Sequence, residues 1–251
     1  MEASPLGICR FCWQSLEPWA GPVCNCCGLP FAAGHALEAV QPQCALCRGE
    51  AFNFDGARSY GLYAGNLRSV ILQLKFQRRE RLGQRLGELL WSLWGWIAEA
   101  CPDEPPVLVP VPLHASRERE RGFNQAELLA QGLARKLARA GGVGRLRLEA
   151  GCLRRTRATA PQTGLTLRAR QENVRGVFSA VRPERVRARV VVLVDDVITT
   201  GATLSACALA LKGAGAQGVL GLTLARATPE FPDVAPHPAA QTVDDFHPSR
   251  P

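Results

Sequence analysis

Residues 190–203 read VVVLVDDVITTGAT, and this stretch decides the fold of the chain. Its first five residues are aliphatic and four of them are β-branched, which is typical of a strand buried on both faces of a parallel sheet. Asp195 and Asp196 stand at the carboxyl end of that strand, where open α/β sheets bind their ligands. A short loop, 199–203, and an apolar-periodic helix beginning near Leu204 follow. The stretch predicts an α/β fold with a ligand site at the edge of its sheet.

The order of these parts predicts a ligand that carries both a phosphate and neighbouring hydroxyl groups. Asp195 and Asp196 can accept hydrogen bonds from two ribose hydroxyls, while the loop N–H groups and the helix dipole hold a 5′-phosphate. Thr203 is placed to cap the helix. The alternative is a buried strand that ends in an ordinary Asp-rich turn. Because all four parts occur in the required order, the ligand site is favoured.

This arrangement resembles the 5-phosphoribosyl 1-diphosphate (PRPP) motif of the type I phosphoribosyltransferases. The resemblance implies that Asp195 and Asp196 bind the ribose hydroxyls. It also implies a fold with a central, mostly parallel sheet flanked by helices, and Mg²⁺ bound together with PRPP. The 5′-phosphate would be held by the loop residues Thr199, Thr200, Gly201, Ala202 and Thr203.

The first 48 residues are rich in cysteine. They hold seven of the ten cysteines, six of them as the C-x-x-C pairs Cys9/Cys12, Cys24/Cys27 and Cys44/Cys47. Such pairs indicate a structural tetrathiolate zinc site, which can hold together a segment too short to bury its own core. We favour Cys24, Cys27, Cys44 and Cys47 as the ligands, because Cys24–Gly28 has the form of a zinc-ribbon knuckle. Cys9 and Cys12 remain open: they can replace one pair or join a second, partly vacant site.

Positive charge gathers in the middle of the chain. The net charge is +8, and residues 58–191 hold 25 of the 30 Lys and Arg residues; only three residues in the chain are lysine. Arginine makes bidentate contacts with phosphate, so the region suits PRPP, diphosphate or a nucleic-acid backbone. The alternative, solvated arginines that reflect a GC-rich genome, stays open.

The remaining patterns divide the chain into three parts. We expect a zinc-ribbon head over 1–56, a phosphoribosyltransferase-like domain over 57–227 and a disordered, proline-rich tail over 228–251. No apolar run approaches the ~18–20 residues that cross a membrane, and the first residues lack the pattern of a secretory signal. We therefore expect a cytoplasmic protein without membrane insertion.

Within the expected domain, apolar periodicity predicts alternating strands and helices. Strands are expected at 57–64, 107–109, 146–153, 190–194 and 219–224, and helices at 67–76, 82–97, 125–137 and 203–214. The polar, Arg- and Thr-rich segment 154–178 is a candidate mobile loop over the site.

A wider resemblance covers residues 9 to about 226, which are similar to the ComF family of phosphoribosyltransferase-like proteins. Besides the cysteine head and the central motif, it is carried by Leu74-Lys75-Phe76, Pro110-Val111-Pro112-Leu113, Arg121-Gly122-Phe123-Asn124-Gln125, Thr159 with Gln162, and Arg170 with Asn173. The head departs from some relatives, which have four cysteine pairs where this chain has three. The resemblance implies a role in natural competence, in which transforming single-stranded DNA enters the cytoplasm.

Two functions are weighed on this basis. One is a PRPP-binding protein of the ComF family that acts in DNA uptake, with single-stranded DNA and proteins of the competence machinery as partners. The other is an active phosphoribosyltransferase of nucleotide or related metabolism with no role in DNA uptake. Candidate contacts to diphosphate or nucleic acid are Arg121, Asn124, Gln125 and Arg170, although ion pairing with nearby glutamates explains the two arginines equally well.

Overall fold

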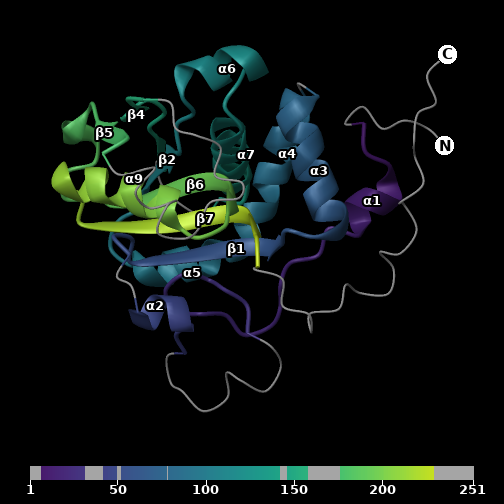
Figure 1. Cartoon of the computed structure of the whole chain (residues 1–251), viewed down its shortest axis with the longest axis horizontal. Helices are drawn as coiled ribbons and strands as arrows, with labels where there is room; N and C mark the ends of the chain where they lie inside the picture. The colour runs from purple at the N-terminus through teal and green to yellow at the C-terminus, as the bar shows by residue number, and fades with distance from the viewer. Residues whose placement is uncertain are drawn as a thin grey trace.

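The chain is built around one parallel β-sheet (Figure 1). The computed structural model describes residues 7–31, 42–49, 52–77, 79–141, 146–157 and 176–228. Five strands lie in the order β1-β7-β6-β2-β3, and every neighbouring pair is parallel. Their bounds are β1 Gly56–Leu62, β2 Val107–Pro110, β3 Arg147–Leu148, β6 Val190–Ile198 and β7 Gly218–Arg226. The predicted α/β fold with a mostly parallel central sheet is confirmed.

Helices cover both faces of this sheet (Figure 1). On one face an apolar cluster joins the sheet to α3 (Gly65–Phe76), α4 (Glu80–Leu89), the 3₁₀ helix η1 (Leu90–Leu93), α5 (Trp94–Ala100) and α7 (Gln125–Arg139). On the other face a second cluster joins it to α9 (Ala202–Gly213) and to an antiparallel pair, β4 (Leu153–Arg155) and β5 (Phe178–Ala180). The central strands are thus buried on both sides, which explains their continuous apolar sequences.

Three expectations differ from the structure in detail. The single helix expected over 82–97 is divided into α4, η1 and α5. The strand expected over 146–153 is two short strands, β3 in the central sheet and β4 in the antiparallel pair, separated by a turn at Gly151 with φ of 82°. Strand β6 is longer than expected and continues through both aspartates to Ile198, because it stays paired with β7 there.

The cysteine-rich head packs on the outer strand of the sheet. Its regular elements are the short helices α1 (Arg10–Gln14) and α2 (Ala45–Gly49). The knuckle that contains Cys26 lies on β1, where the Ala57 N–H donates to the Cys26 carbonyl at 2.7 Å. Much of the predicted loop 154–178 and nearly all of the predicted tail 228–251 lie outside the described residues.

Two further elements complete the described chain, namely α6 (Ala115–Arg121) and the 3₁₀ helix η2 (Pro183–Arg185). None of the helices in the described ranges is long and apolar enough to cross a membrane.

Candidate functional site

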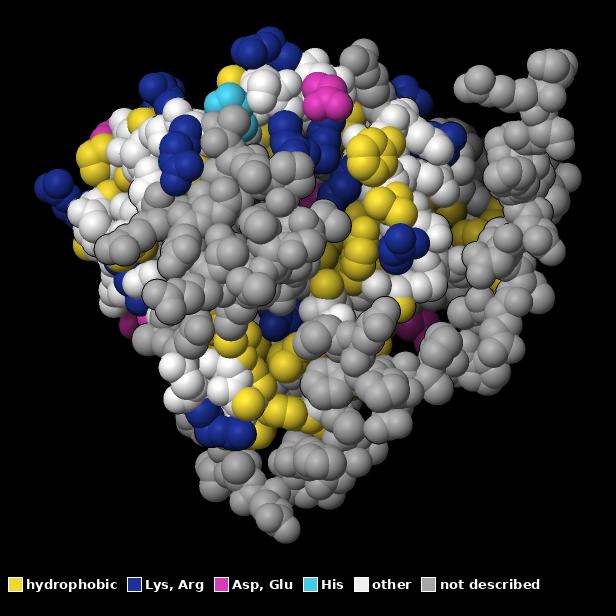
Figure 2. All heavy atoms as spheres, in the orientation of Figure 1, with side chains coloured by type: hydrophobic (Ala, Val, Ile, Leu, Met, Phe, Trp, Pro, Cys, Tyr) yellow, Lys and Arg dark blue, Asp and Glu magenta, His cyan; other side chains and the backbone are white. Residues whose placement is uncertain are grey.

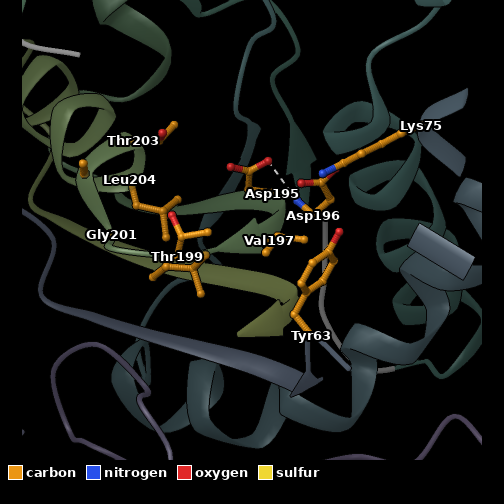
Figure 3. Close-up of a pocket in the computed structure, with 11 residues that line it drawn as sticks. Tyr63, Lys75, Asp195, Asp196, Val197, Thr199, Gly201, Thr203 and Leu204 are labelled. Carbon is orange, nitrogen blue, oxygen red and sulfur yellow. Dashed lines mark hydrogen bonds and ion pairs between the residues drawn. The ribbon is translucent and has the colours of Figure 1, made fainter. Parts of the chain in front are cut away.

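A cavity of about 280 Å³ opens at the carboxyl edge of the sheet (Figure 3). It exists because β2 pairs with β6 only as far as Val194, while β6 continues to Ile198 along β7. The last four residues of β6 therefore have no neighbour on the β2 side in the described sheet. The cavity is lined by Tyr63, Lys75, Asp195, Asp196, Val197, Ile198, Thr199, Gly201, Ala202, Thr203 and Leu204.

The two aspartates reach this cavity from opposite faces of β6. Side chains alternate along a strand, so Asp195 continues the row of Val191 and Leu193 that faces α9, and Asp196 lies on the other side. There its Oδ2 forms an ion pair with Lys75 Nζ at 3.0 Å. Asp195 Oδ1 accepts a hydrogen bond from the Asp196 N–H at 2.8 Å (Figure 3). The pair thus presents carboxylate oxygens to the cavity from both faces of β6.

The environments of these groups shift their proton affinities for different reasons. Burial, together with the negative charge of Asp196, raises the pKa of Asp195 to about 7. Burial alone would lower the pKa of Lys75, but the Asp196 carboxylate and its hydrogen bond outweigh this effect and raise it. Lys75 is therefore held as a cation at the wall of the cavity.

The loop after β6 forms the other wall, and its geometry corrects one prediction. Thr203 does not cap α9; the N-cap residue is Gly201, with φ of 83° and no side-chain bond to the helix. Glycine is favoured in this left-handed conformation, because a side chain there would strain the backbone. The hydroxyl of Thr200 accepts from the Ala202 N–H at 3.4 Å and braces the turn. Of the five predicted loop residues, all but Thr200 line the cavity.

The segment that joins the head to β1 supports this loop from outside. Phe52 and Phe54 stack with ring centroids 4.8 Å apart, and both rings lie next to Gly201. The neighbouring Asn53 donates through its N–H and its Nδ2 to Ser205 Oγ in the first turns of α9, at 3.0 and 2.9 Å. The loop is thus fixed by contacts that are distant in sequence.

The other predicted contact residues are placed differently. Asn124 is 8% exposed and caps α7: its Oδ1 accepts from the Ala126 N–H, and its Nδ2 donates to the Val111 carbonyl. Gln125 is buried too, whereas Arg121 is half-buried at the end of α6. Arg170 lies outside the described residues. A contact of these residues with diphosphate or nucleic acid stays a prediction.

Two polar side chains of the cavity wall were not among the predicted site residues, although Lys75 was part of the wider family resemblance. Lys75 and Tyr63 come from α3 and the segment before it, and Figure 3 shows the Tyr63 hydroxyl pointing toward Asp196 and Lys75. The sequence did contain a signal for Lys75: it is one of only three lysines in the chain, and it follows Leu74, the last buried residue of α3. The sequence alone does not show that Lys75 lies close to Asp196.

The head contains a candidate metal centre formed by the four cysteines that the sequence favoured. The sulfur atoms of Cys24, Cys27, Cys44 and Cys47 lie within 4.8 Å of one another, and the first three residues are buried. A tetrahedral zinc site with Zn–S bonds of about 2.3 Å places its sulfurs about 3.8 Å apart, and Cys27 Sγ lies 3.6 Å from Cys44 Sγ. A hydrogen bond from the Cys27 thiol lowers the pKa of Cys24 to about 4, against the effect of burial. This tetracysteine cluster is therefore able to hold a metal such as zinc.

Two arginines next to these cysteines supply balancing charge. Arg226, at the end of β7, is 2% exposed, and its Nη2 lies 3.6 Å from Cys27 Sγ. Its Nε and Nη1 have no hydrogen-bond partner among the described residues. Arg58 donates to the carbonyls of Cys24 and Asn25. Zinc with four thiolates carries a net charge of about −2, so the buried Arg226 and the half-buried Arg58 fit its neighbourhood.

Cys9 and Cys12 do not join this cluster. The sulfur of Cys9 accepts from the Cys12 N–H at 3.3 Å at the start of α1, and the pair lies apart from the four clustered cysteines. In the described part of the chain no third Cys, His, Asp or Glu accompanies them as a ligand group. A role of Cys9 and Cys12 as metal ligands thus stays a prediction.

Comparison with known proteins reveals relatives that span nearly the whole chain. Competence protein F of Haemophilus influenzae is 32% identical over 226 residues, which cover 88% of this chain and 91% of that protein. DNA utilization protein YhgH of Escherichia coli is 33% identical over 214 residues, covering 85% and 87%. A solved hypoxanthine phosphoribosyltransferase of Staphylococcus aureus overlaps 59% of this chain and 75% of its own, at 10% identity and a TM-score of 0.35.

No protein-family model matches the chain. Identity above 30% along almost the full length of both sequences nevertheless settles the relationship, and it agrees with the cysteine head and the Asp-Asp motif already described. The chain belongs to the ComF family, the family of competence protein F.

Proposed function

We propose that this protein binds PRPP or another ribose phosphate at the carboxyl edge of β6, and that it acts in the cytoplasmic handling of transforming single-stranded DNA during natural competence. The observation that carries the first part is the cavity in which Asp195, Asp196 and the glycine-bearing loop meet. The names of its relatives, competence protein F and DNA utilization protein, support the second part and favour it over a purely metabolic transferase.

In this proposal each wall of the cavity has its own task. Asp195 and Asp196 accept hydrogen bonds from the ribose hydroxyls, and the loop 199–203 receives the 5′-phosphate at the start of α9. Lys75 adds a positive charge beside the carboxylates, which favours an anionic ligand. Mg²⁺ bound to the diphosphate of PRPP would neutralise part of its charge. The residues orient the sugar and balance charge rather than provide a covalent nucleophile.

The same proposal includes the division of the chain. Residues 1–56 form a zinc-stabilised head on the domain 57–227, which carries the ribose-phosphate site, and 228–251 form a tail. Single-stranded DNA and proteins of the competence machinery are the partners that this role requires.

A thermal-shift titration with PRPP and Mg²⁺ tests the ligand site. A ligand that binds only the folded state at about 100 times its Kd adds about 2.7 kcal/mol of stability. We expect a higher Tm for the wild type and no shift for the double variant Asp195→Asn/Asp196→Asn. Asp103→Asn is the control, because Asp103 is an exposed aspartate before the amino end of β2. A wild type whose Tm does not respond contradicts the ligand site.

Binding to a single-stranded oligonucleotide tests the DNA role. Such binding weakens steeply with salt, because arginine and lysine displace counterions from the phosphates. The logarithm of the binding constant falls with the logarithm of the salt concentration, with a slope of about −0.7 per contacted phosphate. Absence of binding at low salt contradicts direct DNA contact and leaves the ligand site untouched.

A further inference from the structure

Arg226, the last residue of β7, is an arginine in the interior of the protein. The Lys and Arg side chains visible on the face in Figure 2 are exposed to solvent. Arg226 differs from them: only 2% of it is exposed, and it is the one buried Lys or Arg in the part of the chain that the structure describes. A guanidinium is almost never buried in this way unless a partner balances its charge. Its burial therefore indicates a nearby group that needs a positive charge.

The side chain of Arg226 reaches the tetracysteine cluster. Its Nη2 lies 3.6 Å from Cys27 Sγ, one of the four sulfur atoms that lie within 4.8 Å of one another. Its Nε and Nη1 have no hydrogen-bond partner among the described residues. Four thiolates around a divalent metal carry a net negative charge, so the cluster provides the counter-charge that this guanidinium requires. The charge of the cluster thus determines where the side chain lies.

The backbone of the same residue holds two walls of the ribose-phosphate cavity. Arg226 is paired with Ile198, the last residue of β6. The N–H of the next residue, Ala227, donates to the Ile198 carbonyl at 2.9 Å. On the side of β1, the Arg226 carbonyl accepts from the Tyr63 N–H at 2.8 Å. Both Ile198 and Tyr63 line the cavity, and the loop 199–203 begins directly after Ile198.

We propose that Arg226 is a positioning residue for the ribose-phosphate site. The tetracysteine cluster fixes its side chain, and its backbone keeps Ile198 and Tyr63 in the places that the ligand requires. This inference rests on the proposed function, since the site that Arg226 serves is the ribose-phosphate cavity. Because one residue makes both sets of contacts, metal binding at the cluster and ligand binding in the cavity strengthen each other, and linkage makes the two effects equal.

Calorimetric titration of ribose 5-phosphate into zinc-saturated and chelator-treated protein tests this role. We expect zinc to lower the Kd of the wild type for ribose 5-phosphate about fivefold or more, as ordinary coupling free energies do. Arg226→Met keeps a long side chain but removes its charge, so the ratio of the two Kd values should fall below about twofold. The zinc affinity with and without saturating ribose 5-phosphate gives the same ratio by the reverse route.

Competition with a chromogenic chelator measures the other end of the contact. Arg226→Met should bind zinc about 10- to 100-fold more weakly, as is usual when a residue that contacts a metal ligand is replaced. Arg226→Lys separates charge from packing. It restores a cation at the same position and should recover most of the Kd ratio, whereas a role in packing alone is served equally well by methionine. If Arg226→Met does not fold, Arg226→Gln is the neutral variant, and the same loss is expected.

Arg58→Met is the matched control. Arg58 also lies beside the cluster and donates to the carbonyls of Cys24 and Asn25. Its backbone, however, pairs with Leu222 in the middle of β7, and neither residue lines the cavity. This variant should keep the Kd ratio of the wild type, whatever its effect on the zinc affinity.

Three results would overturn the positioning role of Arg226 and leave the ribose-phosphate site standing. They are equal Kd values of the wild type with and without zinc, an unchanged ratio in the neutral variant, and an equal loss of the ratio in Arg226→Lys and Arg58→Met. If ribose 5-phosphate does not bind the zinc-saturated wild type, the ribose-phosphate site itself is wrong, and the role of Arg226 falls with it.

Discussion

At the scale of single residues, Asp195 and Asp196 show how one step along a strand separates two chemical environments. Asp196 lies against the Lys75 ammonium, whereas Asp195 is turned toward α9. There, burial and the charge of its neighbour raise the pKa of Asp195 to about 7. One carboxyl group has a fixed counter-charge, and the other changes its protonation near neutral pH. Ligand binding at this site should therefore depend on the state of Asp195.

The affinity for ribose 5-phosphate is expected to rise with pH. An ionised carboxylate accepts hydrogen bonds from two hydroxyls better than a protonated one, and a group with a pKa of about 7 becomes about tenfold more ionised between about pH 6 and pH 8. The folded-state pKa of Asp195 also lies above its ordinary value of 3.8, so between about pH 4 and pH 7 the empty folded protein holds a proton that the unfolded chain has lost. The stability of the empty protein should thus fall as pH rises from about 4 to about 7.

Asp195→Asn separates this effect from the titration of the phosphate itself. The variant should lose affinity at pH 8 and retain only the pH dependence that belongs to the ligand, whereas Asp103→Asn should follow the wild type. Calorimetry across the pH range measures both. An identical pH profile for wild type and Asp195→Asn would show that Asp195 does not titrate in binding.

At the scale of elements, the site depends on where strands end rather than on which strands form. The apolar runs of β2, β6 and β7 could be predicted, because residues buried on both faces of a sheet are uniformly apolar. The extension of β6 through Asp195 and Asp196 could not, since aspartate is depleted in strands and only pairing with β7 holds it extended. The same limit applies to residues 146–153, whose division between two sheets is decided by partners far away in sequence.

Gly201 is the position at which the loop is most sensitive to change. Gly201→Ala places a Cβ 3.2 Å from Phe52 Cε1 and 3.4 Å from Phe54 Cε1, at a φ of 83° that disfavours any side chain. We expect a loss of stability of about 1–2 kcal/mol and a weaker affinity for ribose 5-phosphate, because the loop shifts.

Gly213→Ala is the control. Gly213 is the last residue of α9, and its added Cβ would have no atom within 4 Å. It should be neutral or stabilising by up to about 1 kcal/mol. Chemical denaturation and calorimetry measure these effects, and equal behaviour of the two variants would contradict the assigned role of the loop conformation.

At the scale of the whole molecule, the head and the domain share one apolar cluster. Cys24, Cys27 and Cys44 belong to the same cluster as Ala202 and Leu204 of α9. Further contacts cross the junction: Lys212 Nζ lies 2.5 Å from Asp55 Oδ1, and Arg226 reaches Cys27, which is 199 residues away in sequence. The spacing of the cysteines predicted which four thiols lie together, since C-x-x-C pairs have a local signature. It contained no sign of Arg226 or of the Phe52 and Phe54 rings, because these contacts arise only when the head packs on the sheet.

Removal of the metal should therefore weaken the ribose-phosphate site as well as the fold. Cys24, Cys27 and Cys44 share an apolar cluster with Phe54, and the Phe54 ring lies next to Gly201, so loosening the head should disturb the phosphate loop. We expect treatment with a strong zinc chelator to lower the Tm and to raise the Kd for ribose 5-phosphate about fivefold or more, in the range of ordinary coupling free energies. By linkage, saturating ribose 5-phosphate must raise the zinc affinity by the same factor.

Variants of the cysteines distinguish this coupling from a general loss of structure. Cys24→Ser/Cys44→Ser should lose zinc, measured by metal analysis of the purified protein, and should bind ribose 5-phosphate as weakly as the chelated wild type. Cys9→Ser/Cys12→Ser is the control with two cysteines changed outside the tetracysteine cluster, and it should keep both the metal and the ligand affinity. If the zinc-free protein remains folded by circular dichroism and binds ribose 5-phosphate with the affinity of the wild type, the head stabilises only itself. In that case the contacts of the head at Gly201 do not change the affinity of the site for ribose 5-phosphate.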